Sequence, residues 1–208
     1  MHNHFHSNPD LRPAGERFFV RSEAGEDVPL RRIRLSDTPE CFGGGRNPDF
    51  FMTDVTGGYG AADAGETVEL VRRERPEPGS PTQLAAARAG VVTPEMAYAA
   101  ARENANLEGF AASLSEPGLE RVRDRLMPLL ERVEPWTGER VRARVAARQA
   151  VIPAAFTHPE VEPTVIGRHF ATKVNANVGT SASSSDWREE GRKMQEALAR
   201  GADTVMDL

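Results

Sequence analysis

The sequence predicts an α/β protein in which a strand-rich beginning and a helical middle precede a strand–helix–strand unit. Short β-like runs lie at 17–20 and 30–35, and residues 82–148 carry apolar side chains at helical spacing. Near the end, strand-like runs at 170–177 and 204–208 flank a helical pattern at 185–200. A strand, a helix and a strand within about forty residues form a βαβ unit, so we expect the two strands to pair in parallel.

Composition excludes several classes of protein. The 208 residues include 26 basic and 31 acidic side chains, for a net charge of −5, which argues against binding to a nucleic-acid backbone. No apolar run approaches the roughly 20 residues that span a membrane, so we expect a soluble, cytoplasmic protein with no membrane partner. Cys41 is the single cysteine. It cannot form a disulfide or a thiolate metal site within the chain, which favours a reducing compartment.

Four regions are expected along the chain. Residues 1–16 read as a disordered tail, in which the alternating His2, His4 and His6 could collect a stray metal ion but more simply form a flexible polar terminus. Residues 17–80 form a β-rich region. Its glycines at 43–45 and 57–58 match no phosphate-binding motif and indicate loops. The proline-rich stretch 74–81 separates this region from a helical one at 81–150, and residues 151–208 form the last region.

The helical region contains several helices with recognisable ends. An alanine-rich helix at 83–89 stops at Gly90, and Thr93 and Pro94 provide the cap and first turn of the next. A third helix is predicted at 119–133, bent by Pro128, and a fourth at 137–149.

Side chains alternate along the predicted strand 170–177. One face carries Phe170, Thr172, Val174 and Ala176, and the other carries Ala171, Lys173, Asn175 and Asn177. The polar face indicates either an interior lined for a polar ligand or an edge strand with one wet face. On the helix that follows, Trp187, Gly191, Met194 and Leu198 share one face, and Gly201 ends it.

The last region contains motifs of one known family. IPAAFTHPE, VNANVG and GADTVMDL lie in order between residues 152 and 208, and TPEM and REN lie upstream in the second helix. VPLR with LS, and TDVTGGY, occur farther forward. Together these segments resemble the N-terminal portion of the phosphomethylpyrimidine synthases of thiamine biosynthesis, the ThiC family.

The resemblance implies a fold and a chemistry. Members of that family have an N-terminal α/β domain and a (β/α)8 barrel, so residues 151–208 would hold the barrel's first βαβ unit and leave the barrel incomplete. They are homodimeric radical-SAM lyases that use a 4Fe-4S cluster, S-adenosylmethionine and a divalent metal, zinc, to convert aminoimidazole ribotide to hydroxymethylpyrimidine phosphate. The family's ribotide-binding Asn and Met match Asn177 and Met206. Its catalytic, metal-binding and cluster-binding residues match nothing here, so we expect this chain alone to be inactive.

Three departures leave alternatives open. Ala155, Thr157 and Thr180 stand where the family has Asn, whereas His158 is retained. Lost amides can leave polar partners unsatisfied in a buried site. The chain could therefore be a non-catalytic dimerisation or interaction module derived from the family, or a relative similar to hydroxybenzimidazole synthase that acts on the same ribotide.

Overall fold

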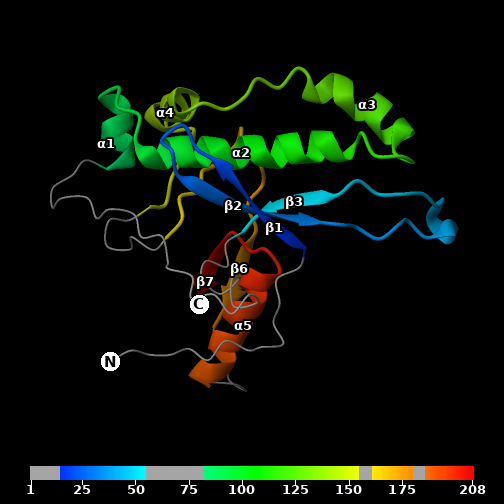
Figure 1. Cartoon of the computed structure of the whole chain (residues 1–208). Helices are drawn as coiled ribbons and strands as arrows, with labels where there is room; N and C mark the ends of the chain where they lie inside the picture. The colour runs from blue at the N-terminus through cyan, green and yellow to red at the C-terminus, as the bar shows by residue number, and fades with distance from the viewer. Residues whose placement is uncertain (1–14, 55–81, 155–160, 180–185) are drawn as a thin grey trace. The chain divides into compact units, whose positions relative to one another are not determined.

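The computed structural model describes residues 15–54, 82–154, 161–179 and 186–208, which form two units (Figure 1). Within them, the larger unit contains 15–53 and the described part of 73–171, and the smaller contains Asp54 and the described part of 172–208. The expectations for His2, His4, His6, Ala155, Thr157, His158 and Thr180 lie outside the described residues. No helix in these ranges is long and apolar enough to cross a membrane.

The larger unit begins with a three-stranded antiparallel sheet. Its strands are β1 (Glu16–Arg21), β2 (Asp27–Ile33) and β3 (Phe50–Thr53), in the order β1-β2-β3, with a 3-10 turn at Glu40–Phe42. The first two strands confirm the sequence prediction, whereas β3 was not predicted. One sheet face buries Val28 and Leu30 against Tyr98 and Ala105 of the long helix α2.

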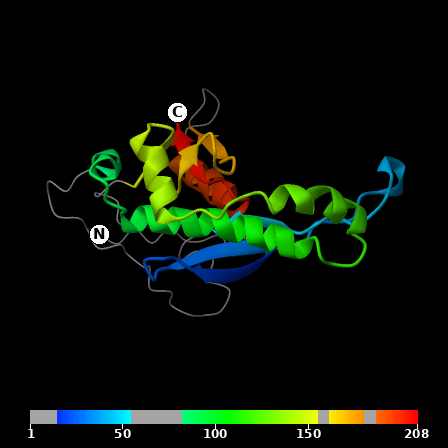
Figure 2. The ribbon, with the colours of Figure 1, turned by 90° about the horizontal axis from the view of Figure 1, so that it is seen from above.

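Helix α2 (Pro94–Ser113) lies along the sheet and is 20 residues long (Figure 2). As predicted, Thr93 caps it by accepting a hydrogen bond from the Met96 amide, with Pro94 in the first turn. Alanines fill much of its surface, which lets the strands and the neighbouring helices approach closely. At Gly109 the absence of a Cβ makes room for the ring of Phe51 on β3.

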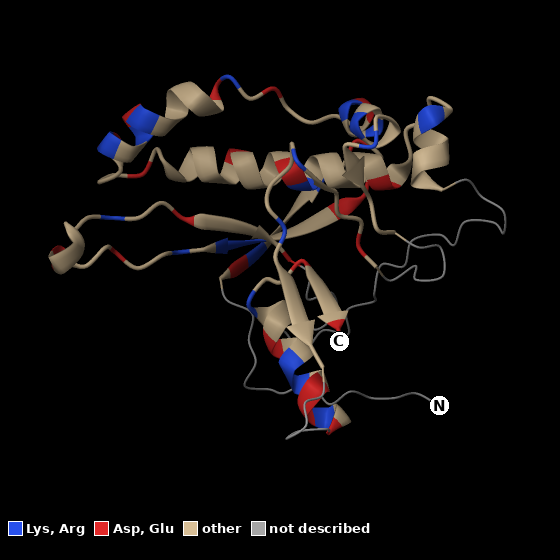
Figure 3. Cartoon of the chain, turned by 180° about the vertical axis from the view of Figure 1, so that it is seen from behind, with Lys and Arg blue, Asp and Glu red and all other residues tan. Residues whose placement is uncertain are grey.

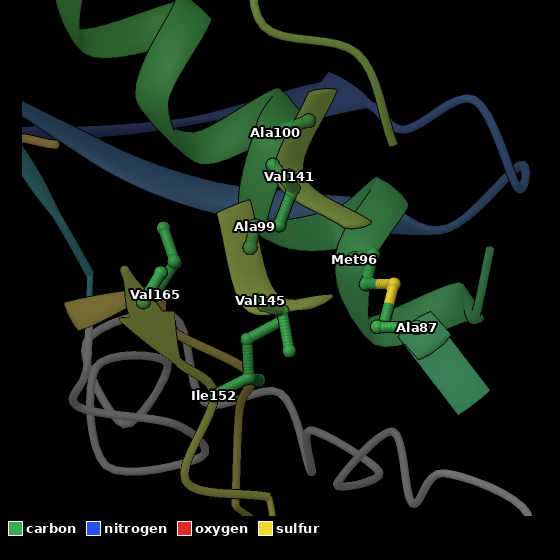
Figure 4. Close-up of a cluster of buried hydrophobic side chains, with 9 residues drawn as sticks. Ala87, Met96, Ala99, Ala100, Val141, Val145, Ile152 and Val165 are labelled. Carbon is green, nitrogen blue, oxygen red and sulfur yellow. The ribbon is translucent and has the colours of Figure 1, made fainter. Parts of the chain in front are cut away.

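A second core lies on another side of α2 (Figure 4). There α4 (Gly138–Ala146) packs against both α2 and α1 (Gln83–Arg88), and α1 ends before Gly90 as expected. The buried side chains of this core are Ala87, Met96, Ala99, Ala100, Val141, Val145, Ala150, Ile152 and Val165. The last three belong to or flank the short antiparallel pair β4 (Ala150–Val151) and β5 (Ile166–Gly167).

Helices α3 and α4 differ in detail from the prediction. Helix α3 (Glu120–Leu130) contains Pro128 but buries none of its own residues. Helix α4 was expected to reach residue 149 but ends at Ala146, and Arg148 adopts a left-handed backbone with φ of 58°. Gln149 instead donates its amide to the Arg144 carbonyl and leads directly into β4.

Three consecutive residues of α2 hold three later segments of the larger unit. Arg102 is buried and donates to the Pro163 carbonyl at 2.7 Å, Glu103 accepts from the Ala171 amide at 2.8 Å, and Asn104 bonds the backbone of Trp136. Successive helix positions point about 100° apart, so one short stretch reaches three directions. The REN motif therefore holds three later segments of the chain against α2 within the larger unit.

The smaller unit contains β6 (Asn175–Val178), α5 (Trp187–Ala199) and β7 (Thr204–Asp207). Strands β6 and β7 pair in parallel, which confirms the predicted βαβ unit. Exposed ion pairs join Glu189 to Arg192 and Glu196 to Arg200, and Figure 3 shows charges of both signs along α5. Among the described residues the sheets are small and none closes into a barrel.

One expectation for this region was wrong. The strand predicted at 170–177 begins at Asn175, because Phe170 stacks on Trp136, with ring centroids 4.2 Å apart, and the Ala171 amide bonds Glu103. Trp187, the first residue of α5, is 67% exposed.

Candidate functional site

The two residues singled out by the sequence are neighbours across the parallel sheet of the smaller unit. The register of β6 and β7 pairs Asn177 with Met206, and Asn175 with Thr204. Because side chains alternate along a strand, all four lie on one face of the sheet. That face is open in the described residues: Asn175 and Asn177 are exposed, and Met206 is 45% exposed.

The opposite face is covered. Ala176, Val178 and Val205 have the other parity and are half-buried, and α5 packs against β6. The alternation predicted for Asn175 and Asn177 against Ala176 is therefore confirmed. Val174 was grouped with the apolar face because it is an even-numbered residue of the predicted strand. It precedes β6 and is 58% exposed, so the alternation of side chains did not predict its burial correctly.

The polar face carries a chain of side-chain hydrogen bonds. The Thr204 hydroxyl donates to Oδ1 of Asn175 at 2.8 Å. Nδ2 of Asn175 then donates to Oδ1 of Asn177, also at 2.8 Å. Thr204 was not singled out from the sequence. Its spacing of two residues from Met206 is the signal that could have identified it, since residues two apart on a strand share a face.

Both ends of β6 are held by carboxylates. At its start, Asp203 accepts a hydrogen bond from the Val174 amide at 2.8 Å. At its end, Glu190 of α5 accepts from the Gly179 amide at 2.9 Å and from the Lys193 ammonium at 2.8 Å. The hydrogen bond from Lys193, followed by that from Gly179, lowers the pKa of Glu190 below its ordinary value of 4.5. These contacts fix the strand that carries Asn175 and Asn177.

Gly179 is required by a close approach at the same end of the strand. A Cβ at this position would lie 2.7 Å from the backbone oxygen of Leu208, and the backbone φ is +154°. Leu208 also donates its amide to the Val178 carbonyl at 2.9 Å. A side chain at position 179 would therefore separate the ends of β6 and β7, beside Asn177 and Met206.

The described residues do not fit a cluster or a catalytic metal. Cys41 is exposed and is the single cysteine of the chain, whereas an iron–sulfur cluster is held by several thiolates. In the parts of the chain that the structure describes, no three His, Cys, Asp or Glu side chains come together as metal ligands. What the open face offers is amide, hydroxyl and thioether groups, which bind an organic ligand through hydrogen bonds and soft apolar contact.

In α/β enzymes the carboxyl ends of parallel strands are where residues that contact small-molecule ligands gather. The model of the Radical SAM ThiC family matches residues 82–208, well over half of the chain. The protein belongs to this family, which links it to thiamine biosynthesis and to radical chemistry with S-adenosylmethionine. The resemblance based on REN, VNANVG and GADTVMDL, all within the matched segment, is confirmed.

Proposed function

We propose that the chain carries the opening part of the substrate pocket of a phosphomethylpyrimidine synthase, which converts aminoimidazole ribotide to hydroxymethylpyrimidine phosphate. In this proposal β6, α5 and β7 are the first unit of a (β/α)8 barrel. The observation that carries it is the pairing of Asn177 with Met206 on one open face. Both residues lie in the last half of their strands, and the carboxyl ends of barrel strands are where active sites gather.

The two side chains have complementary tasks in such a pocket. The Asn177 amide can hydrogen-bond the imidazole or the ribose of the ribotide. Met206 supplies a polarisable thioether that adapts to the flat face of the base. Neither side chain is charged, so the pair would orient the nucleoside part, whereas cations suit the phosphate better.

The cofactors of the proposed reaction need ligands that these residues do not supply. A 4Fe-4S cluster, S-adenosylmethionine and zinc belong to the proposed enzyme, but the lone Cys41 cannot hold the cluster. No chemical step is therefore assigned to residues of this chain. The proposal also includes a carbon–carbon lyase activity, a homodimer and a cytoplasmic location, which follow from the family resemblance alone.

Two observations favour a second candidate from another class. The single cysteine, and the lack of a three-ligand group among the described residues, suit a non-catalytic interaction module derived from the family. Such a module would keep the fold without a working pocket. Ribotide binding separates the two candidates, because only the first requires it.

The experiment is a titration of the ¹⁵N-labelled chain with aminoimidazole ribotide, followed by amide NMR. We expect saturable shifts at residues 175–178 and 204–207, and ribose 5-phosphate, which lacks the base, should bind more weakly. An unchanged spectrum at millimolar ribotide would overturn the substrate-pocket proposal and favour the interaction module.

A further inference from the structure

We infer that Thr204 and Asn175 are positioning residues that orient the Asn177 amide, so that it presents N–H donors to the ligand. The inference rests on the proposed ribotide pocket and adds the direction of its hydrogen bond. The ligand must then offer an acceptor to Asn177, such as a ring nitrogen or a ribose oxygen.

The orientation follows from the order of the bonds. The Thr204 hydroxyl engages Oδ1 of Asn175, and a primary amide carries its oxygen and nitrogen on opposite arms. Nδ2 of Asn175 is thereby aimed along the strand at Asn177, where it meets Oδ1 at 2.8 Å. Because that oxygen is engaged, the other arm of the Asn177 amide, Nδ2, is the one directed away from Asn175.

The arrangement depends on the register of the strands. Asn175 lies opposite Thr204, and Asn177 lies opposite Met206. The chain of bonds thus crosses from Thr204 to Asn175 and then runs toward the carboxyl end of the sheet at Asn177, with Met206 beside it. A hydrogen-bonded chain polarises its members, which makes the terminal N–H a better donor than an isolated amide.

The chain of bonds contributes little to folding. The Thr204–Asn175 and Asn175–Asn177 bonds are exposed, and exposed neutral groups exchange one partner for water at small net cost. The βαβ unit is instead held by its backbone ladder and by the packing of α5 on β6. Breaking the chain of bonds should therefore change ligand affinity more than stability.

The first test reads the orientation without any ligand. In the ¹⁵N-labelled chain we expect the Asn175 side-chain amide protons to exchange slowly and to shift downfield, and those of Asn177 to exchange at the rate of a solvated amide. Thr204→Val should release the Asn175 amide, and Thr204→Ser should preserve it. The reverse pattern, with the Asn177 amide protected and that of Asn175 solvated, would overturn the orientation.

The second test adds aminoimidazole ribotide to the same three proteins. Ribotide should protect the Asn177 amide protons in the wild type. Thr204→Val should weaken ribotide binding about threefold to tenfold, which corresponds to the loss of roughly one neutral hydrogen bond. Thr204→Ser should bind ribotide with nearly the affinity of the wild type. The unfolding midpoints of both variants should be unchanged.

The outcomes separate the two proposals. If the wild type binds ribotide and Thr204→Val binds it with the same affinity, the positioning role is overturned and the substrate-pocket proposal is unaffected. If the wild type itself fails to bind ribotide, the substrate-pocket proposal fails together with the positioning role, while the free amide spectrum still decides the orientation.

Discussion

Asn104 and Trp136 form a reciprocal pair of hydrogen bonds between a side-chain amide and a peptide backbone. Nδ2 of Asn104 donates to the Trp136 carbonyl and the Trp136 amide donates to Oδ1 of Asn104, each at 2.7 Å. The side chain thus provides both bonds that a neighbouring strand would give. Trp136 in turn stacks on Phe170. This pair therefore links α2 to the segment that precedes the smaller unit.

We expect Asn104→Ala to lower the free energy of unfolding by about 1–3 kcal/mol, because a backbone donor and acceptor lose their partners. Chemical denaturation followed by tryptophan fluorescence measures the change. Asn106→Ala is the matched control on the same helix, since the buried Oδ1 of Asn106 has no hydrogen-bond partner within the described residues. Equal destabilisation by the two substitutions would contradict the role given to Asn104.

Glu190 predicts a pH dependence at the end of β6. Its pKa is lowered in the folded protein, first by the hydrogen bond from Lys193 and then by that from Gly179. Its contribution is therefore present above its ordinary pKa of 4.5 and is lost as the pH falls through the lower, folded value. The Gly179 amide resonance should titrate at that lower pH.

Two substitutions serve as controls for the titration of the Gly179 resonance. Glu190→Gln should make the Gly179 shift independent of pH. Glu189→Gln should leave the titration in place, because Glu189 pairs with Arg192 instead. A Gly179 resonance that titrates equally in Glu190→Gln would assign the effect to another group.

Helix ends were predictable because their signals are local. Thr93 and Pro94 mark the start of α2, and Gly90 and Gly201 take the left-handed backbone that ends a helix. The alternation of Asn175 and Asn177 with Ala176 was likewise predictable from the sequence of the strand alone. The family motifs supplied Asn177 and Met206, but only the register of the sheet brings the two side by side.

What the sequence did not predict depends on contacts between distant residues. The alternation of side chains predicted Phe170 to lie in a strand. Its ring instead stacks on that of Trp136, which lies far earlier in the chain. Strand β3 is short and follows a run of glycines, so its pairing with β2 was needed to define it. Thr204 is included in the candidate site because the register of the sheet pairs it with Asn175, and the sequence alone did not show this pairing.

Backbone exchange should be fast in the smaller unit. Strands β6 and β7 form a two-stranded sheet, so each has an edge without a further strand in the described residues. Small open sheets have little local stability. Hydrogen exchange should therefore be faster at Ala176 and Val205 than in the buried turns of α2. Slow exchange at Val205 in a dilute monomer would show that the unit is stable by itself.

The chain should hold no iron–sulfur cluster. Its one cysteine cannot supply the thiolates that a 4Fe-4S cluster requires. After anaerobic reconstitution with iron and sulfide, we expect no stoichiometric absorbance of a cluster in the visible range and no cleavage of S-adenosylmethionine. A cluster at one equivalent per monomer, retained after gel filtration, would contradict this expectation.

The most direct test of the proposed pocket is calorimetric titration of aminoimidazole ribotide into wild type, Asn177→Ala and Val205→Ala. Asn177→Ala removes a hydrogen-bonding side chain from the open face and should weaken binding by about 1–3 kcal/mol, roughly tenfold to a hundredfold. Val205→Ala, on the covered face of the same sheet, should lower stability and leave the affinity nearly unchanged. Equal ribotide affinity in wild type and Asn177→Ala would contradict the assignment of this face as the substrate pocket.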